Sequence, residues 1–144
     1  MNEHAILAPM LGLICWTIIM WVWMYATRIP ALGKTEEVDT NSWVGGTGPD
    51  LDRILPPKTQ WIAHNYNHLH ESPTIFYALC LALAILDAGS GTIVAIAWIY
   101  VGLRILHSLV QALWNRIIVR FAVYCMSSFA LFAMAGHTAL IVFA

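Results

Sequence analysis

Residues 5–27 read AILAPMLGLICWTIIMWVWMYAT and include no charged side chain. A helix needs about 20 consecutive apolar residues to cross the roughly 30 Å hydrocarbon core of a bilayer. A segment in lipid must be helical, because its backbone hydrogen bonds have to be made within the segment. Residues 5–27 are therefore predicted to be a transmembrane helix. No basic residue precedes this run and it is too long for a signal peptide, so we expect it to be retained.

The composition of the whole chain agrees with lipid as its solvent. Of its 144 residues, 60% are hydrophobic and 10% are charged, whereas an ordinary soluble domain carries about 25% charged residues. A net charge of −1 gives no electrostatic footprint for nucleic acid. The cysteines lie in apolar runs without metal-ligand spacing, so we interpret them as reduced packing residues. Residues 1–144 are predicted to form a single membrane domain.

Three further apolar segments predict transmembrane helices at residues 59–87, 92–113 and 118–143. The helix at 59–87 has a polar first half, and Pro73 is expected to kink it. Residues 28–58 are polar and rich in Gly and Pro, which is typical of a surface loop. The sequence thus predicts an all-α integral membrane protein, a bundle of four transmembrane helices.

Basic residues are predicted to mark one side of the membrane. They fall in the loop at 28–58, around the turn at 114–117, and in the third helix near that turn. They are Arg28, Lys34, Arg53, Lys58, Arg104, Arg116 and Arg120. Because cytoplasmic loops are enriched in Lys and Arg, loops 28–58 and 114–117 are predicted to be cytoplasmic. Both termini are then predicted to be periplasmic.

Polar side chains gather in the predicted cytoplasmic half of three helices. At about 100° per residue they form one stripe on each helix, and such side chains face each other or a watery cavity. The stripes hold His64, Asn67, His68 and Glu71; Arg104, His107, Ser108, Gln111 and Asn115; and Arg116, Arg120, Tyr124 and Ser127. Arginines bind carboxylates through paired hydrogen bonds. The stripes therefore predict a pocket for a small anionic molecule, open on its apolar side to a lipophilic substrate.

Each stripe also has a structural interpretation. Glu71 and Arg104 are alternatively an ion pair between two helices. Four polar residues alternatively form hydrogen bonds between helices, as is common in membranes: Asn67, Ser108, Gln111 and Asn115. Arg28, Arg116 and Arg120 are alternatively anchors at lipid headgroups. On this interpretation the protein is a non-catalytic membrane subunit or scaffold within a larger membrane complex.

A metal or haem site is a further alternative. His64 and His68 have the i, i+4 spacing of helical metal sites. The residues concerned are His64, His68, His70, Glu71 and His107.

Three runs of residues resemble the MAPEG family, the membrane-associated proteins in eicosanoid and glutathione metabolism. They are residues 65–80 (NYNHLHESPTIFYALC), 97–108 (AWIYVGLRILHS) and 115–120 (NRIIVR). The run ending LRILHS is the most specific, and residues 28–33 (RIPALG) also fit the pattern. The likeness is greatest to bacterial-type members, which implies a multi-pass protein of a bacterial inner membrane. It covers all the predicted helices and implies a MAPEG-like four-helix bundle.

The resemblance implies a homotrimer that acts as a glutathione-dependent transferase or peroxidase on lipophilic electrophiles. Glutathione, the cosubstrate, would bind between neighbouring subunits in the cytoplasmic half. Arg120 matches the arginine that stabilises the glutathione thiolate in well-studied members, and Tyr124 or Ser127 is expected to add a hydrogen bond. The other residues expected to bind glutathione are Arg28, Asn67, His68, Glu71, Arg104, His107, Asn115 and Arg116. The chain departs from the pattern at His68, where many members carry Asn.

Overall fold

The computed structural model of the protein describes residues 5–35 and 42–144, which contain helices and no strand. The all-α prediction is therefore confirmed for these residues. In chain order the helices are α1 (Leu7–Leu32), the 3-10 helix η1 (Pro49–Arg53), α2 (Pro57–His68), α3 (Ser72–Ile85), α4 (Thr92–Leu109), the π-helical turn η2 (Val110–Trp114) and α5 (Ile117–Phe143).

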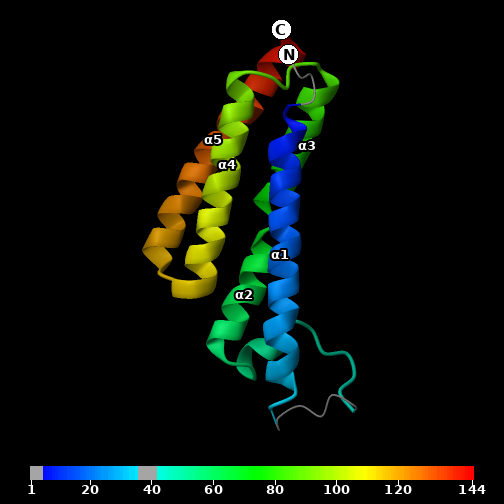
Figure 1. The fold of residues 1–144 in the computed structure, drawn as a ribbon, viewed down its shortest axis with the longest axis vertical. Helices are drawn as coiled ribbons and strands as arrows, with labels where there is room; N and C mark the ends of the chain where they lie inside the picture. Colours follow the sequence, from blue (N-terminus) through cyan, green and yellow to red (C-terminus); the bar gives the residue numbers. More distant parts are fainter. Residues whose placement is uncertain (1–4, 36–41) are drawn as a thin grey trace.

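Three of these helices are long and apolar enough to cross a membrane. They are Leu7–Leu32, Thr92–Trp114 and Ile117–Phe143, each with a mean hydropathy of 1.9. The fourth column of the bundle consists of α2 and α3, which follow one another alongside α1 (Figure 1). The predicted bundle of four columns is therefore present among the described residues, with three columns able to cross a membrane and the fourth in two pieces.

The first helix is longer than the sequence predicted. α1 ends at Leu32 and includes Pro30, although the sequence placed the end of this helix at residue 27. The backbone N–H of Gly33 closes the helix by donating to the carbonyl of Ile29 at 3.2 Å. Arg28 therefore lies on the last turns of a rigid helix and not in the loop.

The helix predicted at 59–87 is broken and not merely kinked. α2 ends at His68 and α3 begins at Ser72, with Pro73 in its first turn. Proline has no N–H and its ring clashes with the carbonyl four residues earlier, which is that of Leu69. At the start of a helix neither defect matters. The chain therefore breaks just before Pro73.

The loop between α1 and α2 is held to the helices by polar contacts. The hydroxyl and the backbone N–H of Thr47 donate to Asp50 at 2.7 and 2.8 Å, and they hold the pKa of that carboxyl below its usual value. Arg28 donates to the carbonyl of Gly48 at 3.1 Å. Gln60, which is buried on α2, donates to the carbonyl of Leu51 at 2.5 Å. The described part of the loop is thus docked against α1 and α2.

The chain termini lie at one end of the bundle with the α3–α4 turn, and the α1–α2 loop lies at the other end (Figure 1). Apolar side chains fill the core, and the rings of Phe76 and Tyr100 stack with centroids 4.5 Å apart. The most deeply buried of the apolar core residues include Leu13, Met20, Phe76, Leu83, Ala97, Tyr100 and Met134. Further along α4 and into η2, the buried side chains become polar, with Arg104, His107, Ser108 and Gln111 all buried.

Candidate functional site

Arg104 on α4 is fully buried beside the break between α2 and α3. Its Nη2 donates to the carbonyl of His68 at 3.1 Å. In an unbroken helix this carbonyl would accept from the N–H of residue 72. The guanidinium therefore replaces a helical hydrogen bond that the break has removed. Its Nε and Nη1 are buried without a hydrogen-bond partner among the described residues.

Two histidines and a tyrosine from three helices meet next to this arginine. The ring of His68 lies 5.1 Å from that of His107 and 5.4 Å from that of Tyr124, measured between centroids. The guanidinium carbon of Arg104 lies 5.8 Å from the centroid of the Tyr124 ring. His68 Nδ1 also lies 2.5 Å from Glu71 Oε2. The end of α2 is thus tied to α4 and α5 through aromatic and cationic groups.

Arg120 is positioned by the turn between η2 and α5. Its Nη1 donates to Oδ1 of Asn115 at 2.8 Å. Asn115 has a left-handed backbone (φ 52°, ψ 31°) and its N–H donates to the carbonyl of Val110. Asparagine is one of the few residues that adopt this conformation readily, and single π-helical turns are frequent at functional sites. The turn therefore fixes both the backbone and the arginine that leads into α5.

These side chains line a small cavity of about 150 Å³. Its lining residues are His68, His107, Ile117, Arg120, Phe121 and Tyr124. A fixed cation and a phenol hydroxyl, one helical turn apart on α5, are suited to stabilise a small anion. Ile117 and Phe121 are 74% and 61% exposed, so this cavity borders the outer apolar face of α5.

The structure brings most of the predicted site residues together, but not all of them. Arg28 bonds Gly48 and Gln60 (3.1 and 3.3 Å) at the end of α1 and lines no part of the cavity. Arg116 is exposed and lies over the Trp114 ring at 5.5 Å. Asn67 is also exposed. The residues that gather around the cavity are His68, Glu71, Arg104, His107, Asn115, Arg120 and Tyr124.

The alternative of an ion pair between Glu71 and Arg104 is wrong. Within the described ranges the ion pairs are His64–Asp52 and His68–Glu71. The Glu71 side chain is 65% exposed, whereas Arg104 is fully buried. The break in the helix turns Glu71 outward, so that it meets His68 and not Arg104.

Of the residues considered as metal ligands, His68, Glu71 and His107 lie near one another, whereas His64 and His70 have other partners. His64 bonds Asp52 at 2.9 Å, and His70 bonds the carbonyl of Tyr66 at 2.9 Å. Across residues 5–35 and 42–144, no group of three or more His, Cys, Asp or Glu side chains is arranged to hold a metal ion.

Asn65 is a buried polar residue that the stripes of the sequence did not include. Its side-chain nitrogen and oxygen are both buried without a partner in the described part of the chain. Ile62 and Leu69, which lie three residues before it and four after it, are also buried. This apolar pair marks the inner face of α2. Its spacing in the sequence would have placed Asn65, and not Asn67, on that buried face.

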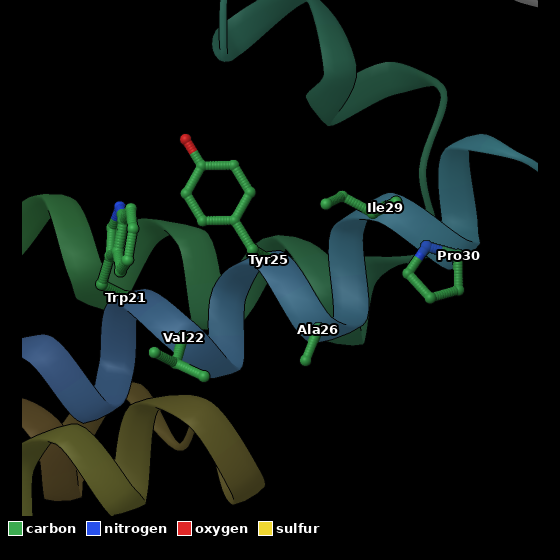
Figure 2. A pocket seen from close by; sticks show the side chains of 6 residues that line it. All are labelled: Trp21, Val22, Tyr25, Ala26, Ile29 and Pro30. Carbon is green, nitrogen blue, oxygen red and sulfur yellow. The ribbon is translucent and has the colours of Figure 1, made fainter.

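A second, wider hollow of about 640 Å³ lies along the outer face of α1. Figure 2 shows its lining residues, which are Trp21, Val22, Tyr25, Ala26, Ile29 and Pro30. Apart from the Tyr25 phenol they offer no titratable group, and no cation lines the hollow. We therefore assign the chemistry to the smaller cavity, where cationic and titratable groups converge.

Comparison with known proteins identifies one family. The model of the MAPEG family matches residues 6–140. No curated protein and no solved structure matches the chain significantly.

Proposed function

Because the chain belongs to the MAPEG family, we propose that it is a glutathione-dependent transferase or peroxidase that acts on lipophilic electrophiles. Family membership alone supports a less specific function, that of a membrane protein related to glutathione or eicosanoid metabolism. The observation that supports the more specific activity is the cavity in which Arg120 and Tyr124 lie beside His68 and His107.

The chemistry requires a reactive sulfur. A free thiol has a pKa near 8.5 and is mostly protonated at neutral pH, and a nearby fixed cation favours its thiolate. In this proposal the Arg120 guanidinium stabilises the glutathione thiolate and the Tyr124 hydroxyl donates a hydrogen bond to it. The bond from Arg120 to Asn115 holds the cation in place before the substrate arrives. Ile117 and Phe121, at the lipid side of the cavity, suit a lipophilic second substrate.

The cavity is too small to enclose the whole tripeptide. Its volume of about 150 Å³ lies below the roughly 300–1,000 Å³ that is typical of small-molecule sites. We propose that a neighbouring subunit supplies the remaining walls, in a homotrimer. The exposed Glu71 carboxylate is available to the ammonium group of the peptide. Arg28 and Arg104 are proposed to orient its carboxylates, with Arg28 contributed by the neighbouring subunit.

The placement of charge supports a cytoplasmic site. The start of α2, which carries Lys58 and follows Arg53 of η1, lies at the end of the bundle opposite the end of α5 (Figure 1). Since Lys and Arg are enriched in cytoplasmic loops, we propose that this end faces the cytoplasm. Cytoplasmic glutathione would then enter from this side.

Thermal unfolding in detergent tests this function. Millimolar glutathione is expected to raise the midpoint of the wild-type protein, because a ligand that binds only the folded state stabilises it. In Arg120→Ala the rise should shrink and the ultraviolet absorbance of bound thiolate should disappear.

Arg116→Ala is the matched control, since Arg116 is a nearby arginine that does not line the cavity. It should respond to glutathione like the wild type. A flat midpoint in the wild-type protein, with the oligomer intact, would contradict the proposal and favour the scaffold alternative. Co-purification with another membrane protein would then be the next observation to seek.

A further inference from the structure

A histidine–carboxylate pair joins the cavity to the exterior of the bundle. His68 Nδ1 lies 2.5 Å from Glu71 Oε2, and the two side chains are 23% and 65% exposed. His68 also lines the cavity together with Arg120 and Tyr124. The imidazole therefore lies between the cavity and an exposed carboxylate.

The break between α2 and α3 creates this arrangement. His68 is the last residue of α2, and Glu71 precedes the first residue of α3 with a non-helical backbone (φ −92°, ψ −101°). Arg104 fixes the carbonyl of His68 at 3.1 Å. The position of the imidazole is thus set by the backbone and by its neighbours on α4 and α5.

We propose that His68, oriented by Glu71, is the general base that takes the proton from the glutathione thiol; this inference rests on the function proposed above. Because Nδ1 is bonded to the carboxylate, Nε2 is the ring nitrogen left to accept a proton. An imidazole held by a carboxylate is a common arrangement for such a base, since the carboxylate stabilises the imidazolium that forms.

The S–H bond breaks, its electron pair stays on sulfur and the proton binds Nε2 of His68. The imidazolium then gives up its Nδ1 proton through the Glu71 carboxylate to water, which leaves a neutral imidazole whose tautomers exchange before the next turnover. The thiolate forms a bond to the electrophilic atom of the second substrate, whose leaving group departs with its bonding pair.

The groups around His68 favour release of this proton. Glu71 faces it from its own column, Arg104 and His107 face it from α4, and Arg120 and Tyr124 face it from α5. The two guanidiniums repel a proton held on the ring and attract the thiolate. Both effects direct the proton away from the cavity and leave the negative charge within it.

The test is the rate of thiolate formation at saturating glutathione, followed by stopped-flow ultraviolet absorbance over a range of pH. In His68→Gln the rate should fall about 100-fold or more, and the dependence of the wild-type rate on protonation of the base should disappear. Stabilisation by glutathione should persist, because Arg120 remains. Glu71→Gln should reduce the rate and shift the same pH profile.

His64→Gln is the matched control, since His64 forms a second histidine–carboxylate pair with Asp52 at 2.9 Å but does not line the cavity. Its rate and pH profile should equal those of the wild type. An unchanged rate in His68→Gln, with thiolate still formed in the wild type, would overturn the general base and leave the proposed function standing. If His68→Gln does not fold, an unchanged rate and profile in Glu71→Gln would overturn it equally. No glutathione response in the wild type would instead refute the proposed function.

Discussion

At the scale of the residue, the ring and the hydroxyl of Tyr124 have different roles. Its ring packs 5.4 Å from that of His68 and beneath Arg104, whereas only its hydroxyl can donate to a thiolate. Tyr124→Phe should keep the packing, and therefore the rise in unfolding midpoint with glutathione. The thiolate fraction at neutral pH should fall about tenfold, as expected for one lost hydrogen bond to a charged group. Ultraviolet difference absorbance of the bound thiolate measures this fraction.

Tyr25→Phe serves as the control for this substitution, because Tyr25 lies on the outer face of α1 (Figure 2). It should leave the thiolate fraction unchanged. An equal thiolate fraction in Tyr124→Phe and the wild type would remove Tyr124 from the mechanism and leave Arg120 to act alone.

The sequence predicted the residue types of the cavity but not their partners. Arg104 and Glu71 were natural candidates for an ion pair, yet Glu71 pairs with His68. Asn67 was placed on the inner stripe, yet it is exposed and Asn65 is the buried asparagine of α2. The first difference arises because a helical wheel assumes an unbroken helix. The second arises because the wheel counts polar residues, whereas burial follows the apolar neighbours Ile62 and Leu69.

At the scale of the element, the turn from η2 to α5 links stability to Arg120. Asn115 supplies both a left-handed backbone and the oxygen that accepts from Arg120. Glycine adopts the left-handed conformation freely, so Asn115→Gly should fold with near wild-type stability but weaken thiolate formation. Asn115→Ala should also lose about 1 kcal/mol of stability, because alanine is strained in this conformation. Denaturant unfolding and thiolate absorbance measure the two effects separately.

Comparing the two variants separates the effect of the hydrogen bond to Arg120 from the effect of the left-handed backbone at Asn115. Equal stability of Asn115→Ala and Asn115→Gly would show that the left-handed residue carries no strain. Wild-type thiolate formation in Asn115→Gly would show that the bond to Arg120 has no part in positioning the cation.

Transmembrane elements were predictable from hydropathy, whereas their interruptions were not. α1, α4 and α5 were predicted because a long apolar run in lipid must form a helix. Pro73 was correctly singled out, but a kink and a break have the same local sequence. In the structure the helix is broken, and Arg104 from α4 donates to the carbonyl of His68, a contact that the local sequence does not reveal. The π-helical turn at Val110–Trp114 had no signal in the periodicity.

At the scale of the whole molecule, the orientation of the bundle can be measured by cysteine labelling. In a variant without its native cysteines, Thr92→Cys should react with a membrane-impermeant maleimide from the periplasmic side. Lys58→Cys should react only after the membrane is disrupted, because the basic end is proposed to face the cytoplasm. Both positions are exposed, which makes them a matched pair. The reverse pattern would place the cavity on the periplasmic side.

Family membership was identified in the sequence from the residues around Glu71, Arg104 and Arg120, and the family match over residues 6–140 confirms it. The outer surface was less informative. Ile29 is 63% exposed, Phe129 is 72% exposed and Phe132 is 67% exposed, as expected for faces covered by lipid. Surfaces between subunits in a membrane are equally apolar, so neither hydropathy nor exposure distinguishes them.

The short length of α3 has a consequence for how the protein enters the membrane during synthesis. With 14 residues, α3 is about 21 Å long at 1.5 Å per residue, which is less than the roughly 30 Å of hydrocarbon. A segment of this length is a poor stop signal for the insertion machinery by itself. The turn to α4 is tight, with left-handed backbones at Asp87 and Gly91. Since α3 packs against α1 and α5, it is suited to stay in the bilayer only when those two helices are there to hold it.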